Sequence, residues 1–194
     1  MLRSLPARRR VLTALLALLL SVLSINIADA VIQVLIPLQQ LIEKDADLIF
    51  IAKVERLDPE KPALVLTVSE KLKGDVSFER LPVNLTGDKE LHTPKLLKRL
   101  ALDVPIVVFV KKEPQSKFMA LAFSNGTWFQ LLGQTEKDST RWAFTHCEPY
   151  LRRTFKGTTA ELQEVVTGVL KKKQKAPSPD KTVQPGLGPE IEQP

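Results

Sequence analysis

Hydrophobic and polar positions alternate with the two-residue period of β-strands through much of the region between residues 47 and 133. The runs Asp47–Glu55 and Ala63–Leu72 flank the polar segment LDPEKP and predict an antiparallel hairpin. The start of the first run is apolar on both faces, which indicates burial on both sides. A third strand is predicted at 80–86, where Pro82 favours an edge or a strand start.

A second group of strands follows. The runs PIVVFVKKE at 105–113 and KFMALAF at 117–123 are rich in β-branched and aromatic residues and predict an antiparallel pair. Asn125-Gly126 is typical of a tight hairpin turn and leads into TWFQLL, which takes the sheet to about Gly133. Residues 134–157 mix aromatic and charged side chains without a clean period and are interpreted as irregular.

Helical periodicity occurs at three places. A lead-in helix is predicted within residues 31–45, and a short helix starts at Pro94 and ends before Pro105. A C-terminal helix is predicted at 158–173, where Thr158 and Glu161 form a capping-box pair. The remaining residues, 174–194, are rich in proline and poor in packable side chains, so their composition predicts disorder.

Strand, strand, strand, helix, strand, strand is the element order of an OB-type barrel. We therefore expect an α+β, mainly β, fold in which residues 46–133 form a five- to six-stranded antiparallel OB-type barrel with a short helix after its third strand. Residues 134–173 then form a C-terminal extension that carries an amphipathic helix. The chain is long enough for one such domain.

The patterns KDADLIFIAKVERL, LVLTVSEKLKGD and PIVVFVKK resemble the barrel of netrin-like domains related to tissue inhibitors of metalloproteinases, over residues 45–133 and including Lys73-Gly74. The resemblance implies an OB-type barrel in an exported bacterial protein. Inhibitors of that family present an N-terminal cysteine to the catalytic zinc. Cleavage after Ala30 would expose Val31 instead, so the resemblance implies the barrel without this mechanism.

Residues 1–30 have the pattern of a signal peptide, with four arginines, an apolar run from Val11 to Ile25 and the small-residue sequence ADA before the expected cleavage after Ala30. The sequence therefore predicts an exported protein, periplasmic or secreted, and leaves Sec or twin-arginine export open. The alternative is an uncleaved N-terminal membrane anchor, because apolar residues resume at Val31. That alternative would bury Asn26 and Asp29 in hydrocarbon.

Candidate catalytic and metal-binding residues are scarce, with two histidines and one cysteine in the chain. His146 and Cys147 are sequence neighbours, and neighbours in an extended strand point to opposite faces. His92 and His146 lack the close spacing of zinc ligands, and the sequence contains no phosphate-binding loop or dinucleotide motif. We expect no catalytic residue, no metal site and no cofactor.

Nucleic-acid binding is disfavoured, although OB-type barrels commonly bind single strands with aromatic and basic residues. Export separates the chain from most nucleic acid, and Phe50, Phe109 and Phe123 are expected in the core. The basic candidates lie mostly at strand ends, where charges protect sheet edges. These candidates are Lys53, Arg56, Lys71, Lys73, Lys111, Lys112 and Lys117.

The segment from Arg141 to Phe155 supplies the candidate partner contacts, namely Trp142, Tyr150, Arg152 and Arg153. Trp, Tyr and Arg are enriched at interface hot spots. Alternatively, Trp142, Phe144 and Tyr150 seal the barrel against the last helix. The basic run at 171–175 offers a weaker candidate contact to anionic lipid or cell-wall polymer.

The sequence thus predicts an exported, non-catalytic binding or structural module whose partner is an unknown protein or envelope component. A metalloprotease-inhibitor-like barrel acting on a secreted protease is one alternative. Binding of nucleic acid or an envelope polymer by the barrel is another. Direct membrane association is expected only if the signal segment is uncleaved.

Overall fold

The computed structural model describes residues 34–137 and 139–192, all within the unit Val31–Pro194. The expectations for residues 1–33, including the signal peptide and its cleavage after Ala30, lie outside the described residues. Within the described part of the chain, no helix has both the length and the apolar character needed to cross a bilayer.

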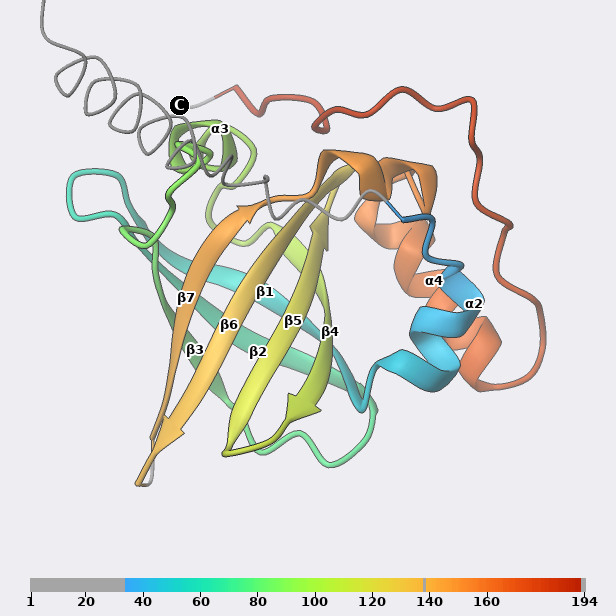
Figure 1. The fold of residues 1–194 in the computed structure, drawn as a ribbon, viewed down its shortest axis with the longest axis horizontal. Coiled ribbons are helices and arrows are strands. Elements are labelled where there is room, and N and C mark those ends of the chain that lie inside the picture. The colour runs from blue at the N-terminus through green and yellow to red at the C-terminus, as the bar shows by residue number, and fades with distance from the viewer. Residues whose placement is uncertain (1–33, 138, 193–194) are drawn as a thin grey trace, which may run out of the picture. The chain divides into compact units, whose positions relative to one another are not determined.

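Seven strands close into a barrel in the order β1-β2-β3-β7-β6-β5-β4 within the described residues (Figure 1). β1 pairs antiparallel with both β2 and β4, and β7 pairs antiparallel with β6 but parallel with β3. The strands are β1 (Leu48–Asp58), β2 (Ala63–Lys73), β3 (Arg80–Asn84), β4 (Pro105–Glu113), β5 (Lys117–Ser124), β6 (Thr127–Glu136) and β7 (Ser139–Cys147).

The prediction of a closed, mainly β barrel is confirmed, but the prediction of five to six strands is wrong because β7 lies in the segment expected to be irregular. A register shift between Gln130 and Leu131 of β6 explains why the sequence of β7 lacks the two-residue period of a strand. Trp142 and Phe144 face the interior on one side of that shift, and Cys147 faces it on the other. A bulge changes which side chains point inward, so strict alternation is lost.

The helices are short and lie outside the sheet. The expected lead-in helix is a single α-turn, α2 (Leu38–Gln40), followed by the π-helix η1 (Leu41–Asp45). The middle helix, α3 (Thr93–Leu97), is shorter than expected, and a 3₁₀ helix, η2 (Pro149–Arg153), follows β7. The last helix is α4 (Thr159–Leu170), and the predicted capping box of Thr158 with Glu161 is confirmed.

The apolar side chains form two layers on opposite faces of the same strands. Along β1, Phe50 and Val54 point into the barrel, whereas Ile49 and Ile51 point outward. The outward layer continues on β4 and β5 and packs against apolar residues of α2, η1 and α4. Burial of β1 on both faces, as the sequence predicted, follows from this arrangement.

The α3 region closes one end of the barrel (Figure 1). Leu96 and Leu100 are fully buried and belong to the interior cluster. The Thr93 hydroxyl donates a hydrogen bond to the Leu85 carbonyl (2.9 Å), which ties the start of α3 to the end of the third strand. The helix predicted to start at Pro94 is therefore packed against the interior of the barrel.

Lys73, at the end of β2, fastens the lead-in helices to the barrel. Its ammonium group donates hydrogen bonds to the carbonyl oxygens of Ile42 (2.8 Å), Glu43 (3.1 Å) and Ala46 (2.5 Å). A helix leaves its last carbonyls unpaired, and a cation at this end satisfies them. Gly74 follows with φ +74°, a conformation that frees the chain to leave the strand.

The C-terminal segment 174–192, for which composition predicts disorder, follows a defined course over the folded unit. Its backbone makes hydrogen bonds to η2, to β6 and to the α3 region, for example Asp180 N to Arg153 O (2.8 Å) and Ile191 N to Lys98 O (2.8 Å). Main-chain hydrogen bonds need no packable side chain, so a composition-based prediction does not detect them.

We predict that replacing Lys73 with Met lowers the free energy of unfolding by about 1–3 kcal/mol, since it removes charge-assisted hydrogen bonds to partly buried carbonyls. Urea denaturation followed by tryptophan fluorescence measures the change. Lys71→Met is the matched control, because Lys71 is an exposed residue of the same strand. Equal stability of the two variants would contradict the capping role.

Candidate functional site

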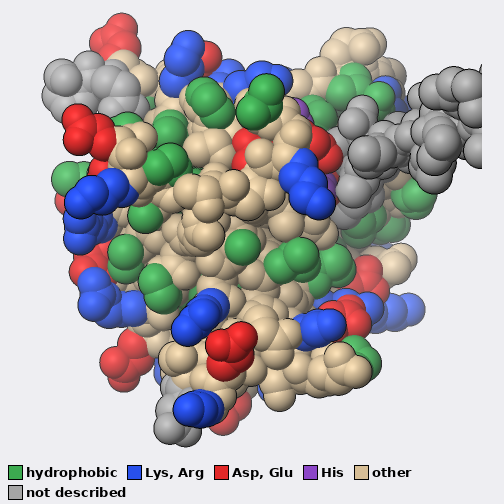
Figure 2. Space-filling model, turned by 60° about the vertical axis from the view of Figure 1, so that its left-hand side comes forward, with side chains coloured by type: hydrophobic (Ala, Val, Ile, Leu, Met, Phe, Trp, Pro, Cys, Tyr) green, Lys and Arg blue, Asp and Glu red, His purple; other side chains and the backbone are tan. Residues whose placement is uncertain are grey.

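The outer face of the barrel is divided into a covered side and a side without helices. α2, η1 and α4 pack on the outer faces of β1, β4 and β5. In Figure 1, α2 and α4 lie to the right of the barrel, while β7 and β3 lie on its left. Figure 2 brings that left-hand side forward, and hydrophobic side chains there lie between charged and other polar ones.

A hollow of about 810 Å³ lies at the lower end of the strands on this side. Such a volume is within the range of small-ligand sites. We call it the outer groove, and it is lined by Asn84, Glu113, Pro114, Gln115, Lys117, Phe118, Met119, Leu132, Gly133, Gln134, Glu136, Arg141, Trp142 and Ala143.

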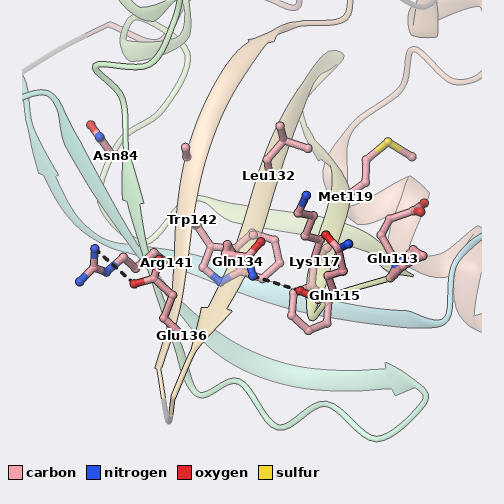
Figure 3. A pocket seen from close by; sticks show the side chains of 14 residues that line it. Asn84, Glu113, Gln115, Lys117, Met119, Leu132, Gln134, Glu136, Arg141 and Trp142 are labelled. Carbon is pink, nitrogen blue, oxygen red and sulfur yellow. Dashed lines mark hydrogen bonds and ion pairs between the residues drawn. The ribbon is translucent and has the colours of Figure 1, made fainter.

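The outer groove joins apolar side chains to a polar rim (Figure 3). Leu132 is 47% exposed, which is high for a large apolar side chain in the middle of a strand. Met119 and Ala143 stand on the strands to either side, β5 and β7, directly opposite Leu132 in the register. Exposed apolar area rimmed by polar residues marks contact surfaces in many proteins.

The rim of the outer groove balances its charges. Lys117 and Arg141 are basic, Glu113 and Glu136 are acidic, and Arg141 lies 3.6 Å from Glu136 in an exposed ion pair. The amide of Gln134 donates hydrogen bonds to the carbonyls of Gln115 (3.1 Å) and Thr135 (3.2 Å). This rim has no excess of positive charge with which to attract a polyanion.

Trp142 borders the outer groove from inside the barrel. It is 2% exposed and forms an aromatic cluster with Phe78 (ring centroids 5.4 Å apart) and Phe118 (5.8 Å). Gly133 makes room for it, because a Cβ at Gly133 would lie 2.9 Å from the indole ring. The indole Nε1 is buried and has no hydrogen-bond partner among the described residues. Trp142 is thus a core residue that lies behind the groove.

Tyr150, Arg152 and Arg153 lie elsewhere, on η2, which follows the end of β7. The Arg153 guanidinium stacks over the Tyr150 ring at 5.5 Å and donates a hydrogen bond to the Val183 carbonyl (3.0 Å). Arg152 donates to the Leu187 carbonyl (3.4 Å). The four candidate partner contacts therefore do not form one surface, and both arginines contact the chain's own C-terminal segment.

The two histidines and the cysteine make contacts within the fold, near the end of β7 and the start of α3. His146 Nε2 lies 2.7 Å from a carboxylate oxygen of Glu148, and both side chains are buried. His92 Nδ1 accepts a hydrogen bond from the Cys147 backbone N–H (3.0 Å). Burial raises the pKa of the Cys147 thiol to about 12, so this cysteine is protonated at neutral pH and a weak nucleophile.

The described residues include no group of three or more His, Cys, Asp or Glu side chains placed to hold a metal ion. Three of the seven basic candidates for nucleic-acid contact are engaged within the fold. Lys73 caps η1, Lys111 pairs with Glu113 (3.0 Å) and Arg56 pairs with Asp58 (3.5 Å).

Sequence reasoning missed the outer groove, although one signal was present. Leu131 and Leu132 are adjacent in a strand, so one of them must point outward. Leu131 is fully buried and Leu132 takes the exposed position. Comparisons with known protein families, with curated proteins and with solved structures found no match to this chain.

We predict that the His146–Glu148 pair makes stability depend on pH. The hydrogen bond that His146 donates to the Glu148 carboxylate raises the pKa of His146 in the folded state, against the opposing effect of burial. The protonated pair therefore stabilises the fold fully below the unfolded pKa of about 6.5, and this contribution is lost as pH rises through the folded pKa.

The test is Glu148→Gln, followed by urea denaturation across pH and by NMR titration of His146. The difference in unfolding free energy from wild type should shrink between acidic and alkaline pH, and the pKa of His146 should fall in the variant. Glu79→Gln, at an exposed position, should leave both quantities unchanged. An unchanged His146 titration in Glu148→Gln would refute the coupling.

Proposed function

We propose that this chain is an exported, non-catalytic binding module and that the outer groove is its recognition surface. This proposal rests on one observation: Leu132 is exposed between Met119 and Ala143, and all three residues line a hollow. The internal contacts of His92, His146 and Cys147 further support binding rather than chemistry, since each group is engaged in the fold.

The ligand we propose is an extended segment of a partner protein with apolar side chains at alternate positions. Leu132 is flanked by Met119 and Ala143 across neighbouring strands, so apolar anchors are available on one line across the sheet. The balanced rim charges favour a peptide over a polyanionic nucleic acid or envelope polymer. Internal hydrogen bonds engage the side-chain oxygen of Asn84 and the side-chain nitrogen of Gln134, so the Asn84 nitrogen and the Gln134 oxygen are the groups suited to main-chain groups of such a segment.

We further propose that the barrel is of the OB type with two added strands. Three features support this assignment: β1 pairs with both β2 and β4, α3 lies between β3 and β4, and the last strand runs parallel to β3. The netrin-like likeness remains a proposal that rests on these features and on the sequence patterns. The inhibitor-like alternative differs in that it requires slowed turnover by a secreted metalloprotease.

We predict that selection from a random dodecapeptide display library on the immobilised protein enriches peptides with alternating apolar residues. Leu132→Lys should weaken binding of a selected synthetic peptide about tenfold or more, because it places a charge at the apolar anchor. Leu102→Lys is the matched control, since Leu102 is also exposed (62%) but does not line the groove. Fluorescence anisotropy measures both affinities. Equal binding by the two variants would remove the outer groove as the site.

Export is tested separately by N-terminal sequencing of the protein recovered from its producing cells. A mature chain that starts at Val31, outside the cytoplasm, is the expected result. Recovery of the chain with Met1 intact in a membrane fraction would replace export with N-terminal anchoring.

A further inference from the structure

The C-terminal segment Asp180–Ile191 lies along a surface assembled from three separate parts of the fold. These parts are η2, the start of β6 and the α3 region. In Figure 1 the segment, coloured red, leaves the α4 side of the molecule and crosses the top of the barrel towards α3. We call the surface beneath it the tail site.

The tail site holds the segment mainly through its backbone. Asp180 N donates to Arg153 O (2.8 Å), Gly186 N to Pro149 O (3.1 Å) and Ile191 N to Lys98 O (2.8 Å). Gly188 N donates to the Thr127 hydroxyl (3.0 Å), and Gly188 O accepts from Arg99 Nε (2.8 Å). Hydrogen bonds of this kind recognise an extended peptide without demanding particular side chains.

Selectivity comes from three features of the bound segment. Leu187 packs against the interior apolar cluster. Gly188 is buried so closely that a Cβ there would lie 2.1 Å from the Asn125 carbonyl oxygen and 2.8 Å from the Thr127 hydroxyl. Glu190 then lies 3.5 Å from Arg99 and 3.7 Å from Lys98. The tail site thus selects an apolar residue, then glycine, then a carboxylate.

The contacts that hold this segment are of a kind that another peptide could replace. Of the side chains from 180 to 191, Val183 is buried and most others are exposed or partly exposed. When the segment leaves, hydrogen bonds to water largely replace the backbone hydrogen bonds that are lost. Lys171–Lys173 are bonded to the last turn of α4, and the exposed residues Pro177 and Ser178 that follow give the chain a place to turn away from the fold.

We propose that the tail site is a peptide-binding site, that residues 180–191 fill it in cis, and that the same segment of a second copy fills it in trans when the cis segment is displaced. Exchange of an identical element between copies requires no new recognition surface. Arg152 and Arg153, which the sequence marked as partner contacts, lie in this site. The proposal is independent of the outer groove.

The test uses full-length Gly188→Ala, whose own segment no longer fits because of the clash with Asn125 and Thr127. Gly186→Ala is the matched control, since a Cβ there meets only the end of the Arg152 side chain at 3.5 Å. The probe is a fluorescent synthetic peptide of residues 182–192. By anisotropy, Gly188→Ala should bind it about tenfold or more tightly than wild type or Gly186→Ala, where the cis segment competes.

Two results would overturn the peptide-binding part of the proposal. One is a folded Gly188→Ala protein, verified by circular dichroism, that does not bind the peptide. The other is equal binding by all three proteins, which would place the peptide elsewhere. Replacing Arg99 with Ala in the Gly188→Ala background should weaken binding, because Arg99 contacts both Gly188 O and Glu190.

A readout on the wild-type protein keeps the test valid if Gly188→Ala does not fold. Trypsin cleaves after Lys181, and the peptide of residues 182–192 contains no lysine or arginine. Excess peptide should displace the cis segment and speed cleavage after Lys181 several-fold, and an unchanged rate would count against exchange.

Occupancy by a second copy is tested by mixing. Fluorescein-labelled Gly188→Ala keeps an intact tail site, and Arg99→Ala keeps an intact segment whose own site is weakened, so sedimentation velocity of their mixture should detect a mixed dimer. Arg99→Ala alone and Gly188→Ala alone should each sediment as monomers. A mixture in which only monomers sediment would exclude the second copy as the occupant.

Discussion

The closed ring of strands is the constraint on which the rest of this structure depends, and β1 joins the first hairpin to the later strands. β1 pairs along one edge with β2 and along the other with β4, which follows it by about fifty residues in the sequence. With both edges paired, no strand of the described barrel is a free edge. Aliphatic and aromatic side chains fill the interior, and Leu96 and Leu100 close it at one end.

Closure also decides where the two proposed binding surfaces lie. A barrel has only an outer face to offer once its interior is packed. Part of that face is covered, because Ile49, Ile51 and their apolar neighbours on β4 and β5 pack against α2, η1 and α4. Outside that covered part, Leu132 is an exposed apolar residue, and the outer groove forms around it.

Much of the fold could be predicted from the sequence because short-range signals specify it. The turn at Asn125-Gly126 has positive φ at both residues, as its hairpin requires, and Thr158 caps α4. β7 could not be predicted because its inward set is interrupted by a register shift that depends on its partner strand. The outer groove depends on which of two adjacent leucines faces outward, and periodicity alone leaves that choice open.

The C-terminal segment illustrates a different limit. Its composition lacks the apolar residues on which core prediction rests, yet Gly188 and Leu187 fit a surface that exists only after the barrel has formed. Trp142 presents the converse case. Its residue type favours an interface, whereas the missing side chain of Gly133 gives it a place in the interior. Neither outcome follows from the local sequence.

The parallel junction between β3 and β7 has a consequence for how the chain reaches this structure. It joins Val83 and Asn84 to Trp142 and Ala143, a short seam between segments nearly sixty residues apart. Every other junction of the ring is longer and antiparallel. Because this seam closes a long loop and gains only a short ladder in return, we expect it to form last during folding. Until it forms, the sheet would be open along β3 and β7, and both strands would expose unpaired backbone groups.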